Sequence, residues 1–136
     1  MLDVEVATRR GTAVSLPRGD LDATTHLTFE AAVDLCLGEP ALIVDLSGVH
    51  FIDGSGIEAL ARVLRRARDQ RTQITVIVPP GRVKRVLCDA GFDRIVSVLE
   101  TVDLALSQIH DNARATERVH NHQWRPSMRR VDAVGN

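Results

Sequence analysis

The spacing of hydrophobic and polar residues changes repeatedly along this chain, and each change predicts a switch between strand and helix. At the start, apolar residues alternate with acidic ones, which is the spacing of a strand that buries one face. The alternating residues are Leu2, Asp3, Val4, Glu5 and Val6. We therefore expect the chain to open with a half-buried β-strand.

A second short strand is expected directly after the first. Residues 9–11, Arg-Arg-Gly, suit a tight turn, and residues 12–17 then form a strand pattern that ends at Pro17. Residues 18–22 make a polar connection to the next element. Two strands joined by so short a turn predict an opening β-hairpin.

The first helical spacing follows this connection. Asp22, Thr24 or Thr25 can cap its start, and Gly38 with Pro40 stops it. We expect the cysteine of its apolar stripe to be a small core residue. The inward positions are Phe29, Ala32, Val33, Cys36 and Leu37.

The most informative stretch lies in the middle of the chain. Residues 41–46 are almost all apolar, which predicts a central strand covered on both faces. A turn of Asp53, Gly54, Ser55 and Gly56 then opens onto a second helix. Its expected inward stripe is Ile57, Leu60, Ala61, Leu64 and Ala67.

Four arginines occupy much of the remaining surface of this second helix: Arg62, Arg65, Arg66 and Arg68. Basic residues on the polar side of an amphipathic helix are usually solvated. We interpret them as a solvated face and not as a phosphate site.

Two further strands and two further helices are expected in alternation. The strands lie at 73–78 and 94–99; Gly91 closes one helix, and Thr101 caps the other, which ends near Asp111. The inward positions are Val83, Val86, Leu87 and Ala90 in the first of these helices, and Val102, Ala105, Leu106 and Ile109 in the second.

Strands that alternate with helices after a hairpin predict an α/β domain in which right-handed crossovers join parallel strands. We expect a mixed sheet of about four or five strands with about four helices, over residues 1–112. Residues 113–136 lose this periodicity and are expected to form a flexible basic tail. The tail contains His120, His122 and Trp124, which we interpret as ordinary tail residues and not as a metal site.

The amino-acid composition argues against some classes of ligand and favours others. The chain has 136 residues, 44% hydrophobic and 26% charged, with a formal net charge of -1, so no preference for polyanions follows. Only 3% are aromatic, which argues against single-stranded nucleic acid as the main ligand and favours protein partners. No signal peptide and no apolar run of about 20 residues is found, so we expect a soluble cytoplasmic protein. Cys36 and Cys88 lie far apart, and we expect neither metal nor cofactor.

The turn at residues 53–56 can be interpreted as one of several kinds of functional site. A hydrolase elbow needs glycine where Asp53 and Ile57 stand, and a phosphate-binding loop needs a lysine, whereas the chain's lysine is Lys84. Asp53 and Glu58 are more typical of capping or solvated groups than of a metal site. Two interpretations remain: Ser55 caps the helix, which stabilises it by about 1 kcal/mol, or Ser55 accepts a phosphate at the helix start.

Three segments resemble the STAS domain of the bacterial anti-sigma factor antagonist type, and together the likeness covers most of residues 10–110. The usual family turn reads Asp-Ser-Ser-Gly with its second serine phosphorylated, which matches Ser55, while Gly54 replaces the first serine. The resemblance implies a STAS-like mixed sheet with helices mostly on one side. The segments are Gly19-Asp20-Leu21-Asp22-Ala23-Thr24, Ile43-Val44-Asp45-Leu46-Ser47-Gly48-Val49 and Phe51-Ile52-Asp53-Gly54-Ser55-Gly56, with Leu60 following.

By this resemblance the protein is not an enzyme. Its unphosphorylated form is expected to bind an anti-sigma factor that is also a serine kinase, and this binding releases a sigma factor. Phosphorylation of Ser55 by the kinase is expected to end the binding, and a phosphatase restores it. The expected partner-binding residues are Asp22, Asp53, Gly54, Ser55, Gly56 and Glu58. The alternative is a STAS subunit of a larger signalling or lipid-transport assembly in which Ser55 is never phosphorylated.

Overall fold

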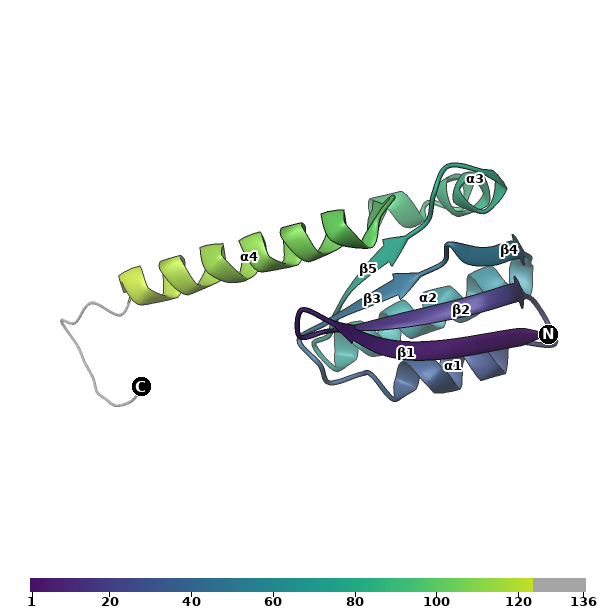
Figure 1. Cartoon of the computed structure of the whole chain (residues 1–136), viewed down its shortest axis with the longest axis horizontal. Helices are drawn as coiled ribbons and strands as arrows, with labels where there is room; N and C mark the ends of the chain where they lie inside the picture. The colour runs from purple at the N-terminus through teal and green to yellow at the C-terminus, as the bar shows by residue number, and fades with distance from the viewer. Residues whose placement is uncertain (124–136) are drawn as a thin grey trace. The chain divides into compact units, whose positions relative to one another are not determined.

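The computed structural model describes residues 1–123, whose elements alternate largely as expected (Figure 1). The chain divides into two compact units, Met1–Leu106 and a second that begins at Ser107. In chain order the elements are β1 (Leu2–Arg9), β2 (Thr12–Leu21), α1 (His26–Asp34), β3 (Ala41–Asp45), β4 (Gly48–Ile52), α2 (Gly54–Asp69), β5 (Gln73–Ile77), α3 (Arg82–Asp89), the 3-10 turn η1 (Phe92–Arg94), β6 (Ser97–Leu99) and α4 (Val102–Gln123).

The opening hairpin is confirmed. Strands β1 and β2 pair antiparallel from Leu2↔Gly19 to Arg9↔Thr12. Arg10 and Gly11 both have positive φ, 51° and 79°, as a two-residue hairpin turn requires.

Strand β2 does not end at Pro17, as expected, but continues to Leu21. Its first half pairs with β3 through Ser15 and its second half with β4 from Arg18 onward. Pro17 lies between these two pairings, where its missing N–H removes no hydrogen bond to either strand. The proline therefore marks a change of neighbour and not the end of the strand.

The sheet has six strands in the order β1-β2-β3-β5-β6, and β4 pairs with β2 off this path. Every pairing except β1 with β2 is parallel. β3 is the central strand with Leu42, Ile43 and Val44 fully buried, as expected. The strand that was not expected is β4. Its buried and exposed residues do not alternate, since only Val49 and Ile52 are buried among its five residues.

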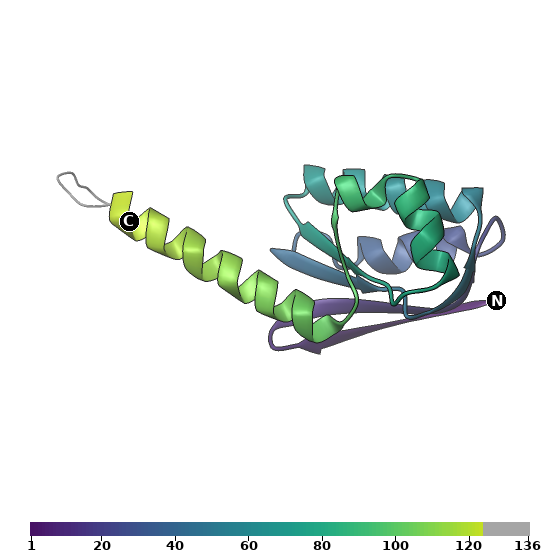
Figure 2. The same ribbon diagram turned by 90° about the horizontal axis from the view of Figure 1, so that it is seen from above.

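Helices α1, α2 and α3 lie on the same side of the sheet, and their buried residues form its main hydrophobic core (Figure 2). Phe29 of α1, Leu60 of α2 and Leu87 of α3 are fully buried. Alternate strand residues point to the opposite face. There Ile43 and Ile77 are buried, as are Ala105 and Leu106 in the first two turns of α4.

Two helices differ from the expectation within the first unit. Helix α1 ends at Asp34, so its expected last turn is irregular, although Cys36 is buried in the core as expected. In α2 the inward stripe is rotated, with Ile57, Ala61 and Leu64 only partly buried. The buried positions are Gly56, Ala59, Leu60, Val63 and Ala67.

Helix α4 continues to Gln123 and not only to about Asp111. Residues 112–123 contain neither glycine nor proline, so nothing in them ends a helix even though the apolar period is lost. Trp124 and the rest of the expected tail lie outside the described residues, as do the side chains of His120 and His122. The flexible tail stays a prediction.

Candidate functional site

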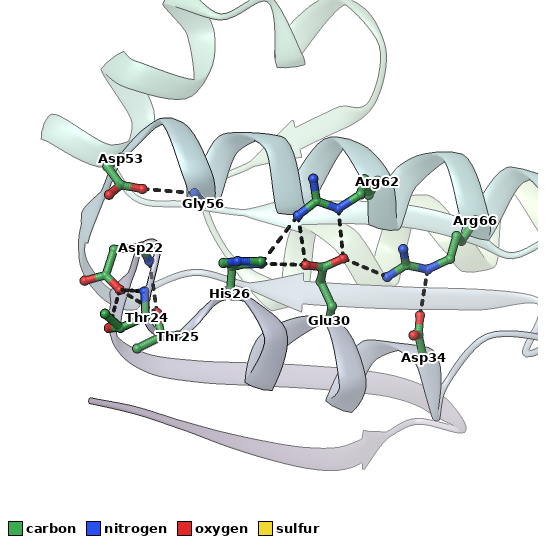
Figure 3. A network of polar contacts seen from close by, with 10 residues as sticks. All are labelled: Asp22, Thr24, Thr25, His26, Glu30, Asp34, Asp53, Gly56, Arg62 and Arg66. Atoms are coloured by element: carbon green, nitrogen blue, oxygen red, sulfur yellow. Dashed lines mark hydrogen bonds and ion pairs between the residues drawn. The ribbon is translucent and has the colours of Figure 1, made fainter.

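Two loops lie side by side where strands β2 and β4 end. Leu21 pairs with Ile52 in parallel register, and the Asp53 N–H donates to the Leu21 carbonyl at 3.3 Å. The loop after β2 and the turn after β4 are therefore adjacent (Figure 3). All six expected partner-binding residues lie on these two loops or in the first turns of α2: Asp22, Asp53, Gly54, Ser55, Gly56 and Glu58.

Asp53, and not Ser55, caps helix α2. Its carboxylate Oδ1 accepts the Gly56 N–H at 3.1 Å, and its carbonyl accepts the Ile57 N–H at 2.9 Å. Ser55 is the second residue of the helix. The expectation that Ser55 is the cap is therefore wrong, because Asp and Ser are both good capping residues and the backbone enters the helix two residues earlier.

The two glycines of the turn have different roles. A Cβ on Gly56 would lie 2.3 Å from the Leu21 carbonyl oxygen and 2.9 Å from Cγ1 of Ile52. Glycine at this position allows the first turn of α2 to pack directly on the end of β2. A Cβ on Gly54 would have no such neighbour within 4 Å. A serine at this position would fit.

The Ser55 hydroxyl is not committed to the fold. The side chain is partly buried, and within residues 1–123 its oxygen has no hydrogen-bond partner. In sequence Ser55 lies between Asp53, whose carboxylate caps the helix, and Glu58, which is exposed. A charge added to its hydroxyl would therefore come within a few residues of two acidic side chains.

Asp22 organises its own loop. Its Oδ1 accepts from the Thr24 N–H at 2.9 Å and from the Thr24 hydroxyl at 2.8 Å. These hydrogen bonds, the one from the hydroxyl above all, lower the pKa of the Asp22 carboxyl. The Thr25 hydroxyl donates to the Asp20 carbonyl at 2.7 Å and accepts the Asp22 N–H at 2.9 Å. The loop next to Ser55 is therefore held in one conformation.

An ion-pair network that was not expected from the sequence joins α1 to α2 behind these loops (Figure 3). Glu30 is only 7% exposed. Its carboxylate accepts Arg62 Nε at 3.1 Å and Nη2 at 3.0 Å, and Arg66 Nη2 at 3.2 Å. His26 Nδ1 lies 2.8 Å from it, and Asp34 accepts Arg66 Nε at 2.9 Å. Two of the four arginines are thus not merely solvated.

The network changes the acidity of its central carboxyl group. Hydrogen bonds from Arg62 first, and then from His26 and Arg66, outweigh the effect of burial and lower the pKa of Glu30 to about 2. Glu30 therefore stays ionised at neutral pH and fixes the two helices that carry the loops. The only sequence signal was a glutamate whose place in α1 is on the inward side, next to Phe29 and Val33.

Two apolar side chains next to the loops are exposed, and no pattern singled them out. Leu27, in the first turn of α1, is 71% exposed, and Phe51, near the end of β4, is 46% exposed. Exposed apolar side chains close to a polar loop are typical of protein-binding surfaces.

In residues 1–123 no group of three or more His, Cys, Asp or Glu side chains is placed to hold a metal ion. No helix in the same part of the chain is long and apolar enough to cross a membrane.

Comparisons with known proteins find anti-sigma factor antagonists of similar sequence and fold. The anti-sigma-F factor antagonist RsfB of Mycobacterium tuberculosis is 26% identical over 110 residues, which cover 79% of this chain and 89% of RsfB. The crystal structure of an anti-sigma factor antagonist from Mycobacterium paratuberculosis has a TM-score of 0.74 at 24% identity and covers 81% of this chain and 95% of that one.

The Bacillus protein SpoIIAA, an anti-sigma factor antagonist solved in unphosphorylated and phosphorylated forms, has the same fold. Its TM-scores are 0.57 and 0.58, at 17% and 18% identity. The matches cover 84% and 80% of this chain, and 98% and 99% of the two SpoIIAA chains. The family model described as the STAS domain matches residues 3–105. With a match over most of its length, this chain belongs to the STAS domain family.

Proposed function

We propose that this protein is an anti-sigma factor antagonist that acts in the cytoplasm. When the protein is unphosphorylated, the surface made by the loop after β2 and the turn after β4 binds an anti-sigma factor. This binding releases a sigma factor for transcription. The anti-sigma factor is also the serine kinase, and phosphorylation of Ser55 ends the complex. The protein is the substrate of that kinase and not itself an enzyme, and a phosphatase restores the binding form.

One observation carries the proposal: the Ser55 hydroxyl has no partner within residues 1–123, although it lies in the first turn of a helix. A serine that contributes nothing to the fold can be modified without unfolding it. Asp22 orders the neighbouring loop, and Leu27 and Phe51 supply exposed apolar area. Together these residues provide what a protein partner needs: rigid polar loops and apolar contacts.

The switch is electrostatic. A phosphate adds a charge of about -1.5 to -2 at pH 7. It would lie beside the Asp53 carboxylate, which already accepts the Gly56 N–H. The added repulsion and the cost of desolvating a dianion oppose binding of a partner that packs onto this turn. The fold itself is expected to stay unchanged.

The test is mass spectrometry after incubation with the co-purifying kinase and ATP, followed by binding measurements. We expect one phosphate on the native chain and none on Ser55→Ala. Ser55→Ala should bind the anti-sigma factor like the native chain, and Ser55→Asp should bind about tenfold or more weakly. A phosphate on Ser55→Ala would contradict the assignment. No phosphate on either protein, with partner binding intact, would favour the unphosphorylated STAS subunit instead.

A further inference from the structure

The four arginines of α2 divide into two pairs. Arg62 and Arg66 are held by Glu30 and Asp34 of α1. Arg65 and Arg68 make no ion pair or hydrogen bond within residues 1–123. Their charges are therefore available to a ligand.

Arg65 and Arg68 line a groove of about 450 Å³ at the C-terminal end of α2. Its walls come from the second half of α2, the start of β5 and the segment between η1 and β6. Ile95 on its rim is 70% exposed. The apolar lining residues are Ala61, Leu64, Ala67, Ile74, Ile95 and Val96.

The groove is separate from the Ser55 site. Ser55 lies in the first turn of α2 and Arg68 in the last, and at about 1.5 Å per residue the two are roughly 20 Å apart along the helix. No residue of the two loops lines the groove. Its role therefore does not depend on the proposed switch.

We propose that this groove binds an amphipathic carboxylate, a small molecule with an apolar chain and one anionic head. The apolar lining receives the chain, and the two guanidinium groups bind the carboxylate, whose geometry they match. The volume lies within the range of about 300 to 1,000 Å³ that is typical of small-molecule sites lined mainly by apolar side chains. The two unpaired positive charges at the rim select an anion over a cation or a neutral chain.

The test is a titration of the full chain with laurate, below its micelle concentration, followed by ¹H–¹⁵N NMR spectra. We expect saturable shifts at residues 64–68 and 95–97, with the turn at 53–56 unchanged. The double variant Arg65→Gln/Arg68→Gln should weaken binding about tenfold or more. Because neither side chain makes an ion pair or a hydrogen bond within residues 1–123, its spectrum should stay that of the folded protein.

Two controls make the test selective. Arg82→Gln/Arg85→Gln removes two exposed arginines of α3 outside the groove and should leave laurate binding unchanged. Dodecyltrimethylammonium carries a chain of similar length with a cationic head and should bind more weakly than laurate.

Three results would overturn the proposal. They are laurate shifts that do not saturate or that lie elsewhere, equal binding by the Arg65→Gln/Arg68→Gln variant, and equal binding of the cationic detergent. Laurate could also fail to bind while an acidic, leucine-containing peptide binds in a way that depends on Arg65 and Arg68. In that case the ligand of the groove is a protein segment, and the assignment to a small molecule is wrong.

Discussion

The two ends of helix α2 differ although they belong to one continuous element. At the N-terminal end Gly56 packs against the Leu21 carbonyl and Asp53 caps the helix, so little space is left. At the C-terminal end the helix borders an open groove with Arg65 and Arg68 at its rim. One helix is thus tightly packed at its first turn and borders an open groove at its last.

The arginines show the physical reason for this difference. Arg62 and Arg66 are four residues apart and face Glu30 and Asp34, which are also four residues apart on α1. Matching spacing on two packed helices brings opposite charges together. Among the described residues no acidic side chain pairs with Arg65, which lies between them in sequence but on another side of the helix.

The largest expected effect on stability comes from adding a side chain at the tight contact at the N-terminal end of α2. Gly56→Ala would place a Cβ 2.3 Å from a backbone carbonyl oxygen that cannot move freely. We expect a loss of about 3 kcal/mol or more in the free energy of unfolding, measured in urea. Gly54→Ala is the matched control, with open space around its Cβ, and should change stability by no more than about 0.5 kcal/mol. Equal losses in both variants would contradict the role given to Gly56.

The next effect comes from the ion-pair network. Glu30→Gln leaves Arg62 and Arg66 facing a neutral amide, and we expect a loss of about 2 to 3 kcal/mol. This is less than the roughly 3 to 5 kcal/mol of a fully buried pair, because both arginine side chains are 37% exposed. Asp34→Asn is the control: its side chain is 47% exposed, and its loss should be below about 1 kcal/mol. A Glu30→Gln protein as stable as the native one would show that the network contributes no net stability.

The same carboxyl group predicts a dependence on pH. Because the pKa of Glu30 is about 2 in the folded protein and near 4.5 in the unfolded chain, its contribution is complete above about pH 5 and is lost as the pH falls toward 2. We expect this loss to be about 2 kcal/mol, reduced from the full shift by the exposed arginines. Urea unfolding of the native chain and of Glu30→Gln at pH 6 and pH 3 measures it, and parallel curves for the two proteins would contradict it.

The smallest effect separates the cap from the switch. Asp53→Ala removes the acceptor of the Gly56 N–H and should cost about 1 kcal/mol. Ser55→Ala removes a hydroxyl that has no partner in the described part of the chain, and should change the free energy of unfolding by less than about 0.5 kcal/mol. The reverse order in thermal or urea unfolding would make Ser55 the cap after all.

Local signals in the sequence determined much of this protein. The order of the elements other than β4, the hairpin turn at Arg10 and Gly11, and the turn at residues 53–56 follow from neighbouring residues, which decide backbone conformation. The turn pattern at residues 53–56 placed Ser55 at a helix start, where the structure also has it.

Only the tertiary structure decided the rest, because the contacts involved join residues far apart in the chain. Glu30 and Arg62 are 32 residues apart, and neither pattern nor composition pairs them. Gly56 is required because of the Leu21 carbonyl on another strand, and β4 exists because β2 offers it an edge beyond Pro17. Whether an arginine of α2 forms an ion pair depends on which element faces it. Sequence periodicity predicts a helix face, but only packing determines what that face meets.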